Sequence, residues 1–364
     1  SVGVEALPVA HLASSAKVDW RVDPARLLQH ARRIAEDAWA ALKQDGIADE
    51  PFFSSNAGRT EGLRVLPSET EALLLKGSIS PLPLHKVLVL LEAMERHADE
   101  RFLRHERVAL AKALVDDIGN LHFGPEVGVG SRKEDAPVVS AWLARVSAMA
   151  RDLEGLRAGT VGSATVHRGD ARDVLGMLPE SSIDAVVTSP PYPNEKDYTR
   201  TTRLESVLLG FIRSRQDLRA LKKNLVRSNT RGVYKEDADD GWVEGHPEIN
   251  RIADAIERRR VELGKTSGFE RMYHRVTKLY FGGMARHFAQ LRTILRPGAK
   301  LAYVVGDQAS YLRVMIRTGQ LLAGIAEDLG YQVERIDLFR TRLATATREQ
   351  LREEVIVLTW PGGE

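Results

Sequence analysis

Cysteine is absent from the 364-residue chain, which excludes disulfide bonds and thiolate metal centres. The chain also has no apolar run long enough to span a bilayer and no signal peptide, so no membrane partner is expected. His85, His97, His105 and His122 lack the spacing with nearby acids that a metal site requires, so no metal is expected. These absences are compatible with a cytoplasmic protein.

The chain also has little net charge. The 52 Lys and Arg residues almost balance the 50 Asp and Glu residues, and the net charge is only +2. This balance gives no global sign of a nucleic-acid partner, so such a partner has to be recognised from local basic clusters. The length and a hydrophobic fraction of 43% are sufficient for one large domain with insertions or for two domains.

The first half of the chain is mostly helical in pattern. Residues 2–5 are expected to form a buried strand that ends in the acid Glu5. Apolar residues then recur at helical spacing, which predicts helices at about residues 22–45, 84–97, 106–118 and 138–156. The stretch 121–135, with Gly124, Gly128 and Gly130, is expected to be a loop.

The second half alternates between short apolar runs and helical patterns, as α/β proteins do. Strands are expected at 164–168, 183–187 and 301–305, a turn at 296–298, and helices at 173–178, 204–212, 272–295 and 315–329. The final strands, 333–339 and 355–360, are joined without a crossover helix, so they are expected to pair antiparallel. Residues 213–268, charged and broken by glycines, are expected to be an irregular insert.

The most informative motif is the sequence Thr-Ser-Pro-Pro-Tyr at 188–192, directly after the apolar run 183–187. Prolines cannot continue a helix or a β-ladder, so the chain has to leave the sheet as a stiff, open turn. In parallel α/β sheets, ligands bind at the carboxyl ends of the strands. This turn therefore places a hydroxyl, a proline carbonyl and an aromatic ring where a flat polar ligand binds.

The motif resembles the catalytic turn of the DNA amino-methyltransferases, enzymes of the class I, S-adenosylmethionine-dependent superfamily. The resemblance implies an α/β fold with a Rossmann-like parallel sheet and a terminal antiparallel strand. It assigns residues 1–18 and 159–364 to the methyltransferase domain, with 213–268 as an insert for target recognition. Residues 19–158 are then a large helical insertion that the resemblance does not explain.

The residue types suit methylation of an exocyclic base amine. Such an amine is a poor nucleophile, because its lone pair is delocalised into the ring. Acceptors around the NH2 group, for which Ser189 and Pro190 are the candidates beside Pro191, favour a tetrahedral nitrogen. Tyr192 can stack on a base flipped out of double-stranded DNA. C5-cytosine methylation normally requires a cysteine nucleophile, which this chain lacks.

The resemblance also implies a site for S-adenosylmethionine. Glu5, at the end of a strand, is expected to bind the ribose hydroxyls, and Gly169, Asp170 and Ala171 to form the turn that binds adenine. The alternative roles are structural: Glu5 as a helix-initiating acid, and Asp170 as a helix N-cap. The family's first strand and glycine-rich turn are not found in the sequence, so a segment N-terminal to residue 1 or a second protein chain is expected to supply them.

Residues on the target side follow the proline turn. Asn194 and Asp197 are candidates for the Watson–Crick edge of the base, and Tyr198 for the wall of its pocket. Arg200, Lys222, Lys223 and Arg227 are candidates for the DNA backbone, because basic residues near an active site are what phosphate binding requires. The alternative for both groups is a solvated loop or helix face.

Methylation of cytosine N4 is favoured, because a serine at the first motif position is more typical of those enzymes. Three alternatives remain open at this point: adenine N6 methylation of DNA, methylation of RNA, and a non-catalytic subunit that binds DNA or a partner methyltransferase. Roles in restriction–modification, in phage defence and in regulation are equally compatible with the sequence.

Overall fold

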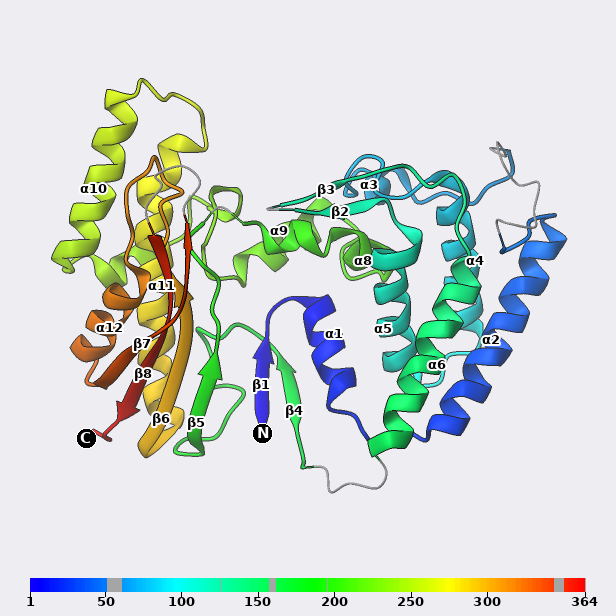
Figure 1. Cartoon of the computed structure of the whole chain (residues 1–364), viewed down its shortest axis with the longest axis horizontal. Helices are drawn as coiled ribbons and strands as arrows, with labels where there is room; N and C mark the ends of the chain where they lie inside the picture. Colours follow the sequence, from blue (N-terminus) through cyan, green and yellow to red (C-terminus); the bar gives the residue numbers. More distant parts are fainter. Residues whose placement is uncertain (51–60, 125, 157–161, 195, 344–349, 364) are drawn as a thin grey trace. The chain divides into compact units, whose positions relative to one another are not determined.

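The computed structural model describes residues 1–50, 61–124, 126–156, 162–194, 196–343 and 350–363 (Figure 1). The chain divides into two compact units. The helical unit comprises residues 1–168 and 198–221, and the sheet unit comprises residues 169–197 and 222–364. Among the helices in these described ranges, none is both long and apolar enough to cross a membrane.

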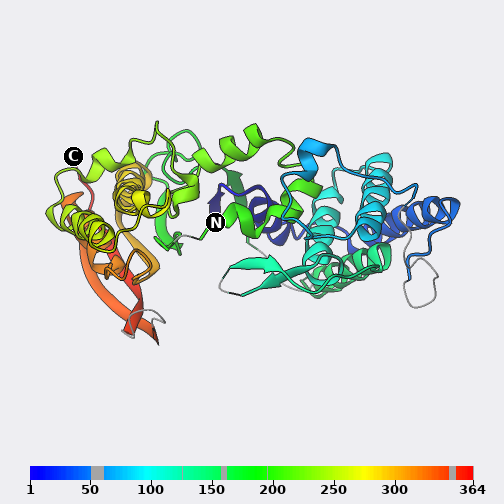
Figure 2. The ribbon, with the colours of Figure 1, turned by 90° about the horizontal axis from the view of Figure 1, so that it is seen from above.

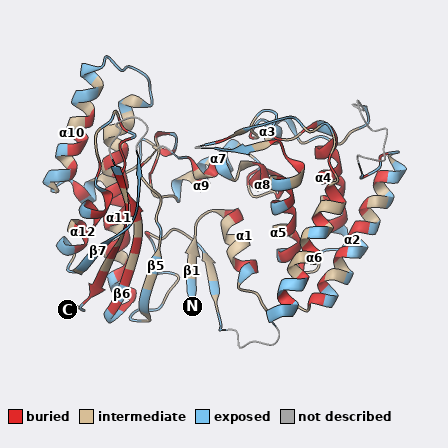
Figure 3. Ribbon diagram, viewed as in Figure 1, coloured by how far each residue is buried: buried red, intermediate tan, exposed pale blue. Residues whose placement is uncertain are grey.

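The helical unit contains the helices that the apolar spacing predicted at about 22–45, 84–97, 106–118, 138–156 and 204–212, and further helices at 8–17, 68–71 and 198–201 that it did not predict. Its helices are α1 (Pro8–Lys17), α2 (Pro24–Gln44), α3 (Ser68–Glu71), α4 (Pro81–Arg96), α5 (Leu103–Ala113), the π-helix Leu114–Ile118, α6 (Val138–Leu156), α7 (Tyr198–Thr201) and α8 (Arg203–Leu208). At the start of α2, the Asp23 carboxylate accepts a hydrogen bond from the Arg26 N–H, and Pro24 occupies the first turn. Figure 3 shows the buried residues of this unit gathered on the helix faces that pack together.

Two small sheets accompany these helices. Strand β1 (Val2–Glu5), as predicted, pairs in parallel with β4 (Thr165–Arg168). The loop predicted for 121–135 is wrong in part, because β2 (Leu121–Phe123) and β3 (Val127–Val129) form an antiparallel hairpin that contains Gly128. Buried Asn120 stabilises the open end of this hairpin. The Asn120 backbone carbonyl accepts a hydrogen bond from the Gly130 N–H, and the Asn120 side-chain oxygen accepts one from the Lys133 N–H. These contacts stabilise two strands that are too short to be predicted from the β-propensity of their residues.

The sheet unit contains a four-stranded sheet in the order β5-β6-β8-β7. Its strands are β5 (Ile183–Thr188), β6 (Leu295–Gly306), β7 (Gln332–Leu343) and β8 (Gln350–Trp360). Strand β5 runs parallel to β6, and β8 is antiparallel to both β6 and β7, which confirms the predicted antiparallel pairing of the last two strands. The ends of β7 and β8 that flank residues 344–349 extend beyond α11 (Tyr273–Ile294) and α12 (Thr318–Asp328) (Figure 2).

Three predictions for the second half of the chain are corrected. Residues 173–178 form one hydrogen-bonded turn instead of a helix, because Gly176 and Pro179 leave too few helix-forming positions. The turn predicted at 296–298 lies within β6, as an irregularity where the register with β5 shifts and Gly298 has φ +85°.

The third correction concerns residues 213–268, which are not irregular throughout. They contain α9 (Arg215–Lys223), two short 3₁₀ turns (Thr230–Gly232 and Asp239–Val243) and α10 (Pro247–Glu262). Helix α10 begins with an N-cap from the His246 side chain and with Pro247, and it buries Ile249, Ile252 and Ile256 on one side. The many charges of α10 occupy its solvent-facing side, so they did not preclude a helix.

The compact units do not follow the predicted domain boundaries. Residues 1–5 and 165–168 group with the helices of 8–156 instead of with the four-stranded sheet. The predicted methyltransferase domain of 1–18 and 159–364 therefore stays a prediction about function, whereas the packing is that of the two units described above.

Candidate active site

The Ser-Pro-Pro-Tyr turn lies at the carboxyl end of β5, as the sequence predicted. Strand β5 ends at Thr188, opposite Tyr303 of β6. The Ser189 hydroxyl donates a hydrogen bond to the carbonyl oxygen of Val304 in β6, at 3.1 Å. Pro190 and Pro191 have no N–H to continue the ladder, and the Asn194 N–H bonds the Tyr192 carbonyl at 2.8 Å. The hydroxyl and the proline carbonyls are thereby held at the edge of the sheet.

The ring of Tyr192 packs against the end of β6. A Cβ atom placed on Gly306 would lie 3.0 Å from Cε2 of this ring, closer than carbon atoms normally approach. Glycine at position 306 therefore leaves the space that the Tyr192 ring occupies. The next residue, Asp307, is buried and pairs with Arg317 at 2.5 Å, a contact that sequence analysis did not single out.

The residues after the turn are tied to the segment 222–232. Asp197 is buried, and its carboxylate pairs with the Lys222 ammonium group at 2.8 Å. Asn229 donates to the Lys196 carbonyl at 3.1 Å, and Asn194 accepts from the Lys196 N–H at 3.3 Å. The structure thus brings together Asp197, predicted for the base, and Lys222, predicted for the DNA backbone.

The other basic candidates in this unit differ in exposure. Lys223 is exposed, and its ammonium group lies 5.7 Å from the centre of the Tyr234 ring. Arg227 is buried and pairs with Asp237 at 2.7 Å. Burial alone raises the pKa of Asp237, but the hydrogen bonds from Arg227 and the Tyr234 N–H, together with the charges of Arg227 and Arg275, outweigh burial and lower this pKa. In this structure Arg227 therefore stabilises the segment that carries Lys223.

The Gly169-Asp170-Ala171 turn is held by Arg172. Both oxygens of the Asp170 carboxylate accept from the Arg172 guanidinium, the shortest bond being 2.6 Å, and Oδ1 also accepts from the Arg172 N–H. The opposite side of the guanidinium pairs with Asp239. Burial lowers the pKa of Arg172, but the two carboxylates outweigh this effect and raise it. Arg172 is therefore a permanent cation at this turn.

His287, which the sequence analysis missed, fixes the same turn from α11. Its Nδ1 lies 2.6 Å from the Ala171 carbonyl oxygen, and its Nε2 lies 2.7 Å from the Tyr303 hydroxyl. Burial lowers the pKa of His287, which favours the neutral ring, so Nδ1–H donates to Ala171 and Nε2 accepts from Tyr303. Tyr303 adjoins Val304, the acceptor for Ser189. The only sequence signal for His287 is a histidine among the apolar residues of a long helix.

Glu5, Tyr198 and Arg200 belong to the helical unit. Oε1 of Glu5 accepts a hydrogen bond from the Leu7 N–H at 2.8 Å, just before α1 begins, which is the helix-initiating contact considered above. Tyr198 and Arg200 lie on α7, a helix of four residues.

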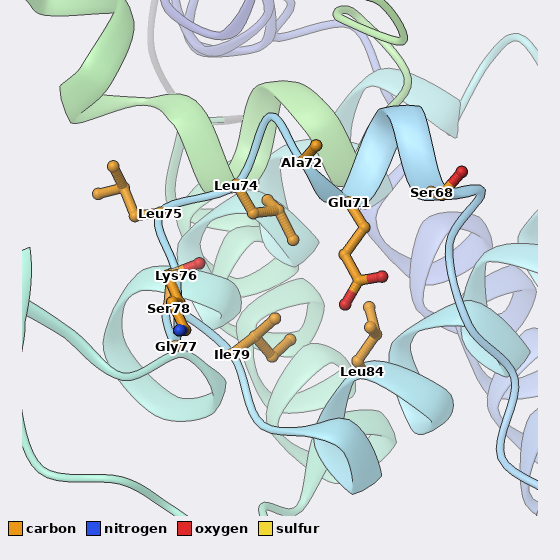
Figure 4. A pocket seen from close by; sticks show the side chains of 10 residues that line it. All are labelled: Ser68, Glu71, Ala72, Leu74, Leu75, Lys76, Gly77, Ser78, Ile79 and Leu84. Carbon is orange, nitrogen blue, oxygen red and sulfur yellow. The ribbon is translucent and has the colours of Figure 1, made fainter.

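A pocket of about 380 Å³ also lies in the helical unit (Figure 4). Its lining comes from α3, the segment that follows α3, and Leu84 of α4, and it includes none of the predicted site residues. Among the described residues, no group of three or more histidines, aspartates or glutamates is placed to hold a metal ion.

Comparison with known proteins gives two informative relatives, although no family model matches the chain. The chain is 30% identical over 208 residues to the type II methyltransferase M.AvaI of Nostoc sp., a match that covers 51% of this chain and 41% of that protein. It is 24% identical over 382 residues to the type II methyltransferase M.BsoBI of Geobacillus stearothermophilus, with 96% of this chain and 72% of that protein covered. These relatives confirm the resemblance to DNA methyltransferases predicted from the Ser-Pro-Pro-Tyr motif.

Solved structures give a weaker likeness. A putative DNA modification methylase of Thermus thermophilus is 17% identical, with 54% of this chain and 52% of that chain covered and a TM-score of 0.26. The same protein complexed with S-adenosyl-L-methionine gives 18% identity and a TM-score of 0.27, with 54% and 55% covered. Scores this low do not establish a shared fold.

Proposed function

We propose that this chain is an S-adenosylmethionine-dependent DNA methyltransferase that methylates the exocyclic amine of a flipped-out base, with cytosine N4 as the favoured target. The observation that carries the proposal is the turn at 189–192, fixed at the carboxyl end of β5 by the Ser189–Val304 hydrogen bond and by the seat of Tyr192 on Gly306. The similarity to type II methyltransferases supports the same class of reaction.

The residues of the turn have distinct roles in this proposal. The Ser189 hydroxyl donates its hydrogen bond to the Val304 carbonyl oxygen, so its lone pairs are left to accept a hydrogen bond from the base amine. The Pro190 carbonyl is the second acceptor, and Pro191 fixes its direction. The Tyr192 ring stacks on the extruded base and offsets part of the free energy of unstacking.

The proposal assigns the adenine contact of the cofactor to the 169–171 turn of the sheet unit. S-adenosylmethionine, when bound, supplies an electrophilic methyl group on a sulfonium sulfur. Asp170, with Gly169 and Ala171, is proposed to accept from the adenine amine; its side chain stays 20% exposed despite the contacts with Arg172. For Glu5, which belongs to the helical unit, binding of the ribose hydroxyls stays a separate prediction from the sequence, by analogy with acids at strand ends in dinucleotide folds.

Double-stranded DNA is the proposed partner. Asn194, Asp197 and Tyr198 are proposed to face the base, and Arg200, Lys222, Lys223 and Arg227 the phosphates. Lys223 is exposed, whereas Lys222 and Arg227 pair with Asp197 and Asp237. The salt dependence of binding is therefore expected to depend on Lys223 more than on Arg227.

The test is a methyl-transfer assay with labelled S-adenosylmethionine, unmethylated genomic DNA and mass spectrometry of the nucleosides. N4-methylcytosine is expected with the wild type, and its loss in Ser189→Ala and Tyr192→Ala. Gly306→Ala should also lose product, because the added methyl group displaces the Tyr192 ring. Ser182→Ala is the matched control, since that hydroxyl bonds the Pro179 carbonyl at the opposite end of β5.

Each other outcome selects one alternative. N6-methyladenine keeps the chemistry and changes the base. Product on RNA alone moves the substrate to RNA, and cofactor binding without product on either nucleic acid points to a missing subunit. A chain that binds no cofactor contradicts the catalytic proposal in favour of a non-catalytic subunit. Supply of a glycine-rich turn by a preceding segment or a second chain stays a prediction, and cofactor binding by this chain alone would show that none is needed.

A further inference from the structure

Arg172 connects two parts of the sheet unit that lie far apart in sequence. One edge of its guanidinium, Nε and Nη2, donates to the Asp170 carboxylate at 3.0 and 2.6 Å. Its Nη1 pairs with Asp239, 67 residues further along the chain, and Nη2 also reaches the Lys223 carbonyl at 3.2 Å. Only 5% of the Arg172 side chain is exposed. The guanidinium therefore bridges the 169–172 turn and the segment 222–243.

Asp239 is itself held firmly in place. It begins the 3₁₀ turn Asp239–Val243, which packs on α11 at Gly282 and Gly283. A Cβ atom on Gly282 would overlap the Asp239 carbonyl oxygen, so only glycine permits this approach. A Cβ atom on Gly283 would lie 3.3 Å from the Asp239 carboxylate and 3.6 Å from Arg172 Cδ. Asp239 therefore has a backbone position fixed by a helix of the core.

We propose that Arg172 is a positioning residue for cofactor recognition, and that Asp239 sets the orientation in which Arg172 presents the Asp170 carboxylate to the adenine amine. This inference rests on the proposed function, because it concerns the adenine contact of that site. A guanidinium is planar and rigid, so fixing one edge on Asp239 fixes the direction of the edge that binds Asp170. Loss of the Asp239 charge leaves the buried cation with one carboxylate, so only Asp170 and the Lys223 carbonyl then hold its orientation.

The positioning role makes a prediction about base discrimination in the cofactor. The carboxylate oxygens of Asp170, as hydrogen-bond acceptors, suit the amine at C6 of adenine but not the carbonyl oxygen that hypoxanthine carries there. S-adenosylhomocysteine should therefore bind more tightly than S-inosylhomocysteine. The site can reject the hypoxanthine compound only while the Asp170 carboxylate is held in position to accept the hydrogen bond from the adenine amine.

The experiment is a calorimetric titration of the full chain with these two compounds. In the wild type the adenine form should be preferred, and Asp239→Asn should reduce that preference on the order of tenfold, as the misplacement of one charge-assisted hydrogen bond would. The matched control is Asp240→Asn, the same change one residue away, where the carboxylate pairs with Arg275 at 3.9 Å. Thermal unfolding of both variants checks that they are folded.

The outcomes separate this inference from the function on which it rests. Reduced preference in Asp239→Asn, with the control unchanged, supports it. Equal weakening of both ligands, an unchanged preference, or the same effect in Asp240→Asn overturns it, because a purely structural role predicts no change in discrimination. A wild type that binds neither compound overturns the proposed cofactor together with the inference, and one that binds both equally overturns the adenine role of Asp170.

Discussion

Glu205 of α8 is a carboxylate that the fold buries without an ion pair in the described part of the chain. Only 5% of the residue is exposed, and its Oε2 is buried without a hydrogen-bond partner. Burial raises the pKa of Glu205 from its usual 4.5 to about 7. The folded state thus binds a proton that the unfolded chain releases over this range of pH, and the charged form of Glu205 destabilises the fold.

The pH dependence follows from this difference. Between pH 4.5 and about 7 the folded state binds more protons at Glu205 than the unfolded state, so the contribution to stability falls as the pH rises, and it is constant above pH 7. We expect Glu205→Gln to remove this decline. The gain at pH 8 has an upper bound of about 3 kcal/mol, at roughly 1.4 kcal/mol per pH unit. Denaturant unfolding at pH 5 and pH 8 measures the free energy of unfolding of the wild type and the variant. If this free energy changed by the same amount between the two pH values in both proteins, the prediction would be contradicted.

At the scale of elements, the close approach of η4 (Asp239–Val243) to α11 depends on Gly282. The substitution Gly282→Ala is expected to destabilise the sheet unit by about 1–3 kcal/mol, the usual effect of overpacking, because a backbone carbonyl cannot turn away as a side chain can. Gly324→Ala in α12 is the matched control: its nearest neighbour would be His246 at 3.9 Å, and alanine favours a helix.

Chemical denaturation of the two variants measures the difference. Gly282→Ala should be less stable than the wild type, and Gly324→Ala as stable or slightly more stable. If both variants gain stability, helix propensity rather than the contact with Asp239 determines the outcome, and the packing argument is wrong.

Elements with one strong periodic face could be predicted from sequence, and elements held by distant contacts could not. Helix α6 was predicted at 138–156, its observed bounds, because its apolar residues repeat at helical spacing. The β2–β3 hairpin was missed because its strands have three residues each and depend on Asn120. Helix α10 was missed because charged residues outnumber its four buried apolar positions.

The candidate site divides in the same way. The turn at Ser189 was predicted because two prolines after an apolar run can continue neither a helix nor a β-ladder. The contacts that hold the 169–172 turn were not predicted, because they join residues that are far apart in sequence. Arg172 pairs with Asp239, and His287 binds the Ala171 carbonyl across 116 residues. Short motifs of reactive residues can therefore be predicted from sequence, whereas the contacts that orient their side chains arise only in the tertiary structure.

At the scale of the whole molecule, the described residues form two separate large hydrophobic cores. The core of the helical unit is centred on residues such as Leu90 and Trp142, and that of the sheet unit on Phe288 and Tyr303. Each core belongs to one compact unit. Chains with separate cores often do not unfold in one step. We therefore expect two unfolding transitions, one for each unit.

Substitutions in each unit assign the two transitions. Lys86 in α4 is fully buried, pairs with Asp135 at 2.6 Å, and donates to the Asp49 and Ala136 carbonyls. Lys86→Met removes the buried ion pair with Asp135 and the donor to the two carbonyls, and it should lower the stability of the helical unit by about 3–5 kcal/mol. Gly282→Ala should lower only the other transition. Differential scanning calorimetry of both variants tests this, because a single transition that both substitutions shift alike would mean that the two cores unfold as one cooperative structure.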